Sequence, residues 1–246
     1  MHLSDIARYL DSYLSINEIE DYKQAINGLQ IENTKNIEKI SVAVDACESV
    51  IRQAIEAGSQ LLIVHHGLFW NGSAPLTGPL YRKVRMAIEA GLALYSSHLP
   101  LDVHPVVGNN ALFADMLTLP KERAPFLGMG CRVETEVPRQ ELLARIENAV
   151  GGRVHLAPGG PEICRKIGIV TGAAGSEVFK AAAAGVDTLV TGEGPHWSYT
   201  AAEELGVNLI YAGHYATETF GVKALGRHLE EKFGLPWQFH DHPTGL

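Results

Sequence analysis

The sequence predicts an α/β fold built from two similar halves. Buried-strand patterns alternate with amphipathic helix patterns, and one such stretch recurs later in the chain. Alternating strands and helices are typical of parallel sheets that helices cover on both faces. No apolar run reaches the roughly 18 residues that a membrane-spanning helix needs.

The individual elements follow from the apolar spacing. Residues 3–14 place apolar side chains at helical intervals, 39–44 predicts a buried strand, 49–57 predicts a helix that Gly58 ends, and 61–64 predicts a second strand. Further on, 209–212 predicts a strand. Residues 222–233 predict an amphipathic helix that Gly234 stops.

An internal repeat indicates that the two halves arose by duplication. Residues 39–70 align with residues 166–197 without a gap, and Gly58 matches Gly185 while Trp70 matches Trp197. A second match pairs residues 95–102 with residues 211–218, where each strand leads into a His-x-x-x-acid sequence. We therefore predict one half over 1–124 and a second over 125–246, whose C-terminal helix contributes to a shared cleft.

The composition narrows the class of protein. The chain has 246 residues, of which 46% are hydrophobic, and a net charge of −8. The hydrophobic fraction is typical of a globular protein. The negative net charge argues against non-specific nucleic-acid binding, but it does not exclude a locally positive site. Three scattered cysteines and an N-terminus without a signal-peptide pattern indicate a soluble, cytoplasmic protein that has no membrane contact.

Histidine and acidic side chains follow four of the predicted strands. They are His65 and His66, His98 and Asp102, Glu193 and His196, and His214 and Glu218. Functional residues of open α/β sheets gather at the carboxyl ends of strands, so halves that face each other would bring these groups to one cleft. A mixed imidazole and carboxylate set suits Zn, Mn, Fe or Ni.

Structural roles are the alternative for several of these residues. Neighbours on a strand point to opposite faces, so His65 and His66 serve one site only if the strand ends there and the chain turns at Gly67. Pro100 argues against a helical turn at 98–102, which is expected to be a loop that presents Asp102.

The remaining candidates keep two interpretations each. Glu218 either binds a metal or interacts favourably, as a negative charge, with the N-terminus of the following helix. Glu193 and His196 are either an acid/base pair or loop residues, and His98 either orients a ligand or is structural. His104 is a candidate partner for a ligand. No phosphate-binding, dinucleotide-binding or nucleophile-elbow motif accompanies them.

Several motifs together resemble the Nif-three-like family, whose members are often named GTP cyclohydrolase 1 type 2 homologues. They are Asn27-Gly-Leu-Gln30, His65-His-Gly-Leu-Phe-Trp70, His98-Leu-Pro-Leu-Asp-Val-His-Pro105, Gly108-Asn-Asn110 and Gly213-His-Tyr-Ala-Thr-Glu218. The resemblance covers essentially the whole chain and matches the short form, which has no inserted domain. Where some relatives carry Asp and paired His, this chain has Glu193-Gly-Pro-His196-Trp197.

The resemblance implies two similar α/β domains with a dinuclear metal site in the cleft between them. It implies His65, His66, Asp102, His214 and Glu218 as ligands of two divalent ions (Zn, Mn, Fe or Ni), with Glu218 as a bridge. It also implies that copies of the chain assemble into a toroidal homohexamer.

Two functions follow as hypotheses. Two divalent ions would leave the pocket electropositive and would activate water, which suits hydrolysis of a small anionic substrate such as a nucleotide. Glu193 and His196 would then be the catalytic acid and base. The alternative is a non-catalytic, metal-loaded ring that stores or delivers metal, or that scaffolds a nucleic-acid or protein partner.

Overall fold

The computed structural model describes residues 1–70, 72 and 74–246 and divides into two compact units. Unit 1 comprises Met1–Leu101 and Gly221–His242, and unit 2 comprises Asp102–Phe220 and Pro243–Leu246. The units differ from the predicted ranges 1–124 and 125–246 because the C-terminal strand pairs within the first sheet, whereas the helix after Asp102 packs in the second core.

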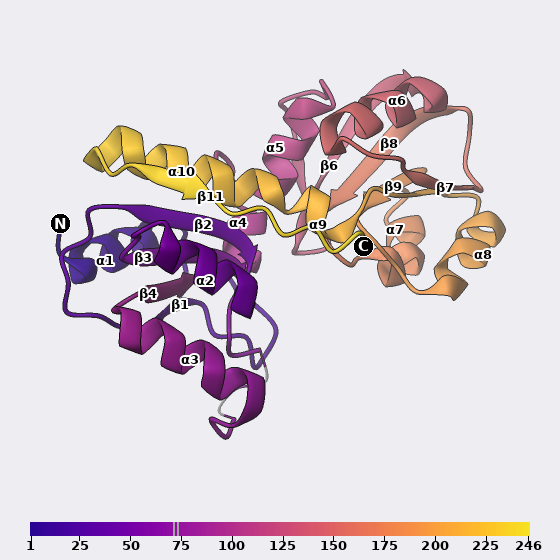
Figure 1. Ribbon diagram of the computed structural model, residues 1–246. Coiled ribbons are helices and arrows are strands. Elements are labelled where there is room, and N and C mark those ends of the chain that lie inside the picture. Colours follow the sequence, from indigo (N-terminus) through magenta and orange to yellow (C-terminus); the bar gives the residue numbers. More distant parts are fainter. Residues whose placement is uncertain (71, 73) are drawn as a thin grey trace. The chain divides into compact units, whose positions relative to one another are not determined.

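Unit 1 is a five-stranded sheet covered by helices. Its strands lie in the order β1 (Gly28–Ile31), β4 (Ala93–Ser96), β3 (Leu61–His66), β2 (Ile40–Asp45) and β11 (Trp237–Phe239). All neighbours are parallel except β1, which is antiparallel to β4. The helices are α1 (Leu3–Tyr13), α2 (Glu48–Glu56), α3 (Gly78–Ala90), most of α4 (Leu99–Asp102) and most of α10 (Thr219–Phe233) (Figure 1).

Alternation along the strands gives this sheet two buried faces. Leu62 and Val64 pack with Ile51 of α2 in one core cluster. On β4, Leu94 joins the same cluster, and the next residue, Tyr95, donates a hydrogen bond to Asp11 of α1 at 2.8 Å. Helices therefore cover both faces, as the sequence predicts.

Unit 2 is a six-stranded sheet between two helix layers. The strand order is β5 (Ala124–Phe126), β6 (Gly130–Pro138), β8 (Ile163–Val170), β9 (Thr188–Thr191), β10 (Asn208–Tyr211) and β7 (His155–Pro158). The central strands β8, β9 and β10 are parallel to one another. The other pairs, β5 with β6, β6 with β8 and β7 with β10, are antiparallel.

Two apolar clusters hold the helices of unit 2 to this sheet. Helices α5 (Asn109–Met116) and α6 (Arg139–Val150) contribute Phe113 and Ile146 to a core with Val190. The 3-10 helix η1 (Gly175–Glu177), α7 (Val178–Ala183) and α8 (His196–Leu205) follow, and Val178 packs with Leu189 in the other cluster. Helix α9 (His214–Thr217) follows β10.

The predicted duplication extends to the register of the strands. Ile40 pairs with Leu61 in unit 1, and the residues 127 positions later, 167 and 188, pair in unit 2. The antiparallel pair Leu29 and Tyr95 likewise corresponds to the pair formed by residues 156 and 210. Four strands of each unit, β1-β4-β3-β2 and β7-β10-β9-β8, are therefore versions of one arrangement.

The register corrects the second repeat by one residue. Ser96 pairs with Val64, and Tyr211 pairs with Thr191, which is the counterpart of Val64. Ser96 and Tyr211 are therefore equivalent, whereas the sequence match aligns Tyr95 with Tyr211. His98 and His214 consequently occupy different positions after their strands.

Three local expectations are wrong. Residues 99–102 form the short helix α4, because Pro100 lies in its first turn, where the missing N–H has no intrahelical partner to lose. Strand β3 continues through His65 and His66 instead of ending before them. The sheets are mixed and not wholly parallel, because β1, β5 and β7 pair antiparallel to their neighbours. An antiparallel pair needs no crossover helix between its strands, so the alternation of strands and helices in the sequence does not reveal it.

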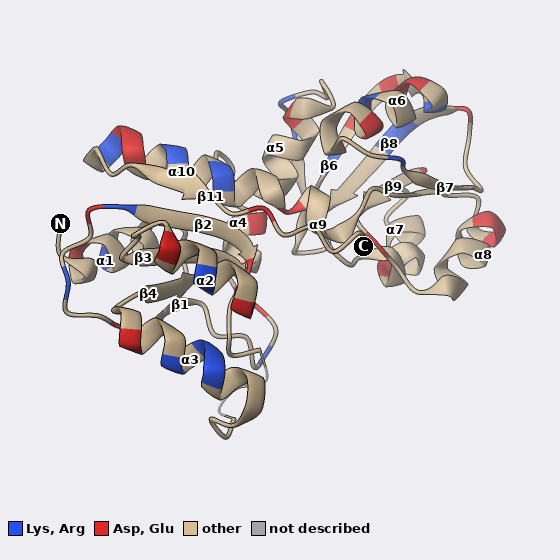
Figure 2. Ribbon diagram, viewed as in Figure 1, with Lys and Arg blue, Asp and Glu red and all other residues tan. Residues whose placement is uncertain are grey.

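Both signs of charge are interspersed along the exposed helices. Helices α2, α3, α6 and α10 each carry basic and acidic residues (Figure 2), so none of these four presents a single-sign stripe of the kind that tracks a phosphate backbone. Among the described residues, no helix combines the length and apolar character needed to cross a membrane.

Candidate metal centre

In unit 1, His65 and His66 end the central parallel strand β3. Nδ1 of His65 lies 2.9 Å from the carbonyl oxygen of Ser97, and Nδ1 of His66 lies 2.8 Å from Oδ1 of Asp45. Both oxygens only accept hydrogen bonds, so each Nδ1 carries the proton and each Nε2 offers a lone pair. The two ring centroids are 4.7 Å apart although both residues belong to one strand.

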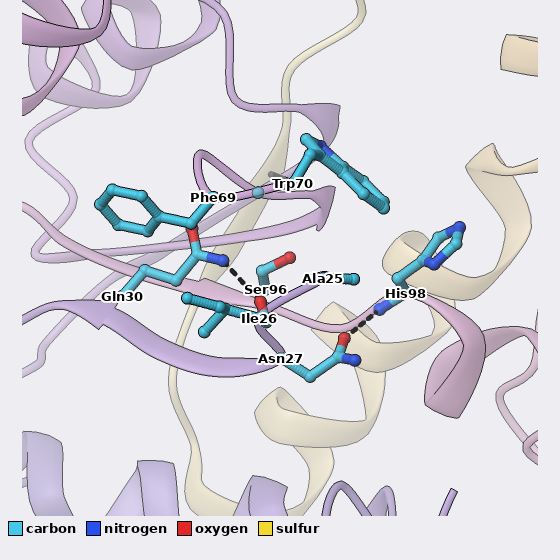
Figure 3. A pocket seen from close by; sticks show the side chains of 9 residues that line it. Ala25, Ile26, Asn27, Gln30, Phe69, Trp70, Ser96 and His98 are labelled. Carbon is cyan, nitrogen blue, oxygen red and sulfur yellow. Dashed lines mark hydrogen bonds between the residues drawn. The ribbon is translucent and has the colours of Figure 1, made fainter. Parts of the chain in front are cut away.

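His98 lies beside this pair and shows the same hydrogen-bond pattern. Its Nδ1 donates to Asp21 at 2.9 Å, and its backbone N–H donates to Oδ1 of Asn27 at 2.7 Å (Figure 3 shows the Asn27 contact). One ligand nitrogen each from His65, His66 and His98 lies within 4.8 Å of the others, so this group is placed where it can hold a metal ion.

Polar residues around a small pocket organise these loops. Gln30 donates to the carbonyl of Ile26 and accepts from the N–H of Leu68, both at 2.7 Å. A Cβ at Gly67 would lie 2.4 Å from Nε2 of Gln30, so only glycine permits this approach. Figure 3 shows Gln30 beside Ile26 in the pocket that His98 and Trp70 also line. The amide of Gln30 fixes the loop that follows His66.

In unit 2, Asp102 is held by a group of polar side chains. The Asp102 side chain is buried, and its Oδ1 accepts hydrogen bonds from Nδ2 of Asn109 at 2.8 Å and from Oγ1 of Thr171 at 3.2 Å. Nδ2 of Asn110 donates to the backbone carbonyl of Asp102 at 2.9 Å. A carboxylate oxygen of Asp102 also lies within 4.8 Å of one of Glu218.

His214 stands between two carboxylates of the same unit. Its Nδ1 donates to Oε1 of Glu193 at 2.7 Å, and its Nε2 lies 3.1 Å from Oε2 of Glu218, which is 2% exposed. Burial by itself lowers the pKa of His214. The hydrogen bonds and charges of Glu218 and Glu193 outweigh it and raise the pKa to about 9. This surrounding of negative charge favours a cation at the Nε2 side of the ring.

Gly172 makes room for the Glu218 carboxylate. A Cβ at Gly172 would lie 2.3 Å from Oε1 of Glu218 and 3.5 Å from Nε2 of His214. Its φ of +71° also belongs to the left-handed region that favours glycine. The backbone at this strand end is therefore shaped around Glu218.

The predicted site residues thus fall into two sets, one in each unit. In unit 1, His65 and His66 lie together with His98. In unit 2, Glu218 lies close to His214 and to Asp102. These imidazole and carboxylate groups are donors of the type that Zn, Mn, Fe and Ni accept.

The other candidates, Glu193, His196 and His104, do not belong to the groups of candidate metal ligands described above. Glu193 contacts His214, while His196 begins α8 with an exposed side chain. Nδ1 of His104 accepts hydrogen bonds from the backbone N–H groups of Val106 and Val107, at 3.2 and 3.1 Å, within its own turn. The acid/base roles of Glu193 and His196 stay predictions.

Sequence reasoning missed the oxygens that orient the histidines. Asp45 is the last residue of the buried strand β2 and could have been found by the rule that identified the other strand ends. Asp21 lies in an irregular segment 77 positions before His98, and nothing in the local sequence connects the two. Gly172 carries no sequence signal beyond that of a tight turn.

Comparison with known proteins identifies relatives over the full chain. The family described as Duf34/NIF3 (NGG1p interacting factor 3) matches residues 1–244. The chain is similar to the GTP cyclohydrolase 1 type 2 homolog of Deinococcus radiodurans, at 42% identity over 98% of this chain and 94% of that protein. It is similar to the protein of the same name from Pyrococcus abyssi, at 39% identity over 100% of both.

Solved structures agree with the fold. TTHA1606 from Thermus thermophilus superimposes with a TM-score of 0.93 at 40% identity, covering 100% of both chains. Reduced HcgD from Methanocaldococcus jannaschii superimposes with a TM-score of 0.88 at 25% identity, covering 98% of both chains.

Proposed function

The chain belongs to the Duf34/NIF3 family, and on that premise we propose that it binds two divalent metal ions and hydrolyses a nucleotide or nucleotide-like substrate. The proposed ligands are His65, His66, Asp102, His214 and Glu218. The substrate class is supported by the relatives that are named GTP cyclohydrolase 1 type 2 homolog.

One observation carries the metal proposal. The three predicted histidine ligands all donate Nδ1–H to an oxygen: His65 to a carbonyl, His66 to Asp45 and His214 to Glu193. Metal-binding histidines usually have such a partner, because it fixes the tautomer and aims the other nitrogen. Three imidazoles held in the same way, in two different units, are more than packing requires.

The residues of the chain supply binding and orientation. When bound, two divalent ions supply Lewis-acid chemistry, an activated water and attraction for an anionic group. Asn109 and Thr171 donate hydrogen bonds to Oδ1 of Asp102 and so hold its carboxylate in place. Asp45 and Glu193 add negative charge behind their imidazoles and make them stronger donors.

The hydrolase proposal is tested by a nucleotide screen on metal-stripped protein reloaded with Mn, Zn, Fe or Ni. We expect turnover in the loaded protein, and its loss in His66→Ala and Glu218→Ala. A matched control is His228→Ala, because His228 stacks on Tyr13 in unit 1 and is not one of the proposed ligands. Equal turnover with and without metal would contradict the proposal.

A non-catalytic role is the second candidate, and the surroundings of two residues favour it. Glu193 is hydrogen-bonded to His214, and the side chain of His196 is exposed. Glu193 is thus placed to orient a ligand, and His196 is placed as a surface residue. In that case the chain stores or delivers metal, or scaffolds a partner. Rapid transfer of bound metal to a chelating acceptor, combined with no turnover in the nucleotide screen, would favour this candidate.

We further propose assembly into a homohexameric ring in the cytoplasm. An exposed aromatic pair supports self-association: Phe179 and Trp197 are 55% and 46% exposed, with ring centroids 6.1 Å apart. Three unbridged cysteines fit a reducing compartment. Light scattering should give six times the mass of the chain, and Trp197→Ser should lower it. A monomer at micromolar concentration contradicts the ring.

A further inference from the structure

Three rings gather in unit 2 outside the candidate metal ligands. His155, the first residue of β7, pairs across the sheet with Tyr211, the last residue of β10. The ring centroid of His155 lies 6.1 Å from that of Tyr211 and 5.5 Å from that of Tyr199 in α8. His155 is exposed, and the two tyrosines are half-buried. We call these three residues the aromatic shelf.

Tyr211 is the fixed ring of the aromatic shelf. The buried Oγ of Ser198 donates its single proton to the carbonyl of Pro195 at 2.6 Å, so the hydroxyl of Tyr211 is the donor in the 2.7 Å bond to the same Oγ. The Tyr211 ring also packs on Gly194, where a Cβ would lie 3.0 Å from Cε1. The imidazole of His155, in contrast, has no hydrogen-bond partner among the described residues.

The aromatic shelf lies at the edge of the sheet where open α/β folds bind ligands. Tyr211 stands at the carboxyl end of β10. Because β7 runs antiparallel to β10, its first residue, His155, lies at the same edge. Tyr199 belongs to the first turn of α8, the helix that follows β9. Ligands of such sheets bind outside the carboxyl ends of the strands.

The aromatic shelf is also close to one proposed metal ligand. Tyr211 precedes His214 by three residues, and consecutive Cα atoms lie about 3.8 Å apart, so the two Cα atoms are at most about 11 Å apart. Gly194, on which Tyr211 packs, directly follows Glu193, the carboxylate that orients His214. A single nucleotide can bridge such a separation with its base at one end and its phosphate at the other.

The duplication shows that the fold does not require these rings. Gly28 pairs with Ser96 in unit 1 in the same way that His155 pairs with Tyr211 in unit 2. Ser96 lines the small pocket of Figure 3. Small side chains therefore suffice for this strand pairing, and the rings are an addition to the shared arrangement. An addition next to a proposed ligand indicates a role in binding.

We propose that the aromatic shelf stacks the base of a nucleotide whose phosphate end is directed to the metal ligands. Every nucleobase has a π-face, and stacking on aromatic side chains holds it without regard to its hydrogen-bonding edge. This inference rests on the proposed function and deepens it. It specifies a nucleoside phosphate as the substrate class and brings the phosphate, instead of the base, to the metal centre.

The test compares two phosphonates, whose P–C bonds resist hydrolysis, by calorimetry on untagged, Mn²⁺-loaded protein. One is the phosphonate analogue of GMP, and the other is the ribose phosphonate that lacks the base. The variants are His155→Ala, His155→Phe, which keeps an aromatic ring, and Tyr199→Leu. The matched control is Tyr81→Ala, because Tyr81 is a 47% exposed aromatic residue of α3 in unit 1. Thermal unfolding checks that each variant is folded.

We expect the wild-type chain to bind the GMP phosphonate about 5–150-fold more tightly than the ribose phosphonate. His155→Ala and Tyr199→Leu should each reduce this preference about fivefold or more and leave the affinity for the ribose phosphonate unchanged. His155→Phe should keep the wild-type preference, because stacking needs the ring and not the imidazole nitrogens. Tyr81→Ala should change neither affinity.

The failure of the inference and that of the proposed function are distinguishable. If Mn²⁺ strengthens both ligands equally and His155→Ala changes neither affinity, the aromatic shelf does not bind the base, while the proposed function stands. If Mn²⁺ strengthens neither ligand, the proposed function fails, and a preference for the GMP phosphonate that His155→Ala abolishes would still support the shelf. Should His155→Ala not fold, an undiminished preference in Tyr199→Leu would overturn the inference.

Discussion

The carboxylate of Glu193 accepts a hydrogen bond from Nδ1 of His214, with 2.7 Å between the two atoms. The equivalent position in unit 1 is occupied by His66, whose Nδ1 donates a hydrogen bond to Asp45. Equivalent positions, at the end of β3 in unit 1 and two residues after β9 in unit 2, therefore hold a proposed ligand in one unit and a carboxylate that orients a ligand in the other.

Replacing Glu193 tests whether it orients His214 or transfers protons. We expect Glu193→Gln to lower the affinity for one metal ion by about 10–100-fold, because the amide keeps an acceptor oxygen but loses the charge behind the imidazole. Glu204→Gln, at an exposed position of α8, is the matched control. Wild-type metal affinity with a strongly reduced turnover number would instead support an acid/base role.

Gly172→Ala tests whether the backbone is shaped around Glu218. A Cβ there would lie 2.3 Å from Oε1 of Glu218, so metal affinity should fall along with stability. Gly185→Ala is the matched control, because its φ of +75° imposes similar strain with nothing within 4 Å. We expect Gly185→Ala to cost about 1 kcal/mol and to leave metal binding unchanged. Equal metal affinities in the two variants would refute the argument.

The raised pKa of His214 predicts that metal binding depends on pH. In the metal-free protein its pKa is about 9, so at pH 7 a proton occupies the ring and a metal ion must displace it. Apparent affinity should rise about tenfold for each pH unit between roughly 7 and 8.5. Calorimetry in buffers of different ionisation enthalpy should detect the released proton, and an affinity that is flat over this range speaks against displacement at His214.

Asp21 predicts a loss of stability in acid. Burial by itself raises the pKa of Asp21, but the hydrogen bond and charge of His98, with the bonds from Asn27 and Tyr22, lower it to about 2. A carboxyl with a depressed folded-state pKa stabilises the fold above its ordinary value of 3.8 and loses that contribution as the pH falls through 2. The contribution is about 2 kcal/mol.

Urea unfolding of Asp21→Asn measures this contribution. The variant should be less stable than the wild-type chain by about 2 kcal/mol at pH 6, and the difference should shrink steadily between about pH 4 and pH 2. A difference that does not change with pH would mean that Asp21 acts through shape and hydrogen bonding alone.

Much of the fold was predictable because the chain repeats itself. The gapless match that aligns Ile40 with Ile167 predicts the same strand register in both units, and the structure has it. A shift of one strand by one residue would turn its buried side chains to the opposite face of the sheet. The antiparallel edge strands were not predictable, because their direction depends on pairing between distant parts of the chain, such as that of Leu29 with Tyr95.

The donors of the candidate site were easier to predict than the groups that orient them. His65, His66 and His214 stand in or next to buried strands, which is a local signal. Asp21 reaches His98 only through tertiary folding, and no periodicity marks it. Pro100 led to the wrong prediction of a loop at 98–102, because proline breaks a helix in its interior but is tolerated in the first turn, where Pro100 lies.

Metal content tests the central claim most directly. Chains purified without a polyhistidine tag, dialysed against buffer and analysed by mass spectrometry of their metals should contain two divalent ions each. Glu218→Ala and His66→Ala should lose at least one ion, while His228→Ala retains both. A wild-type chain that holds no stoichiometric metal, or ligand variants with undiminished content, would contradict the account.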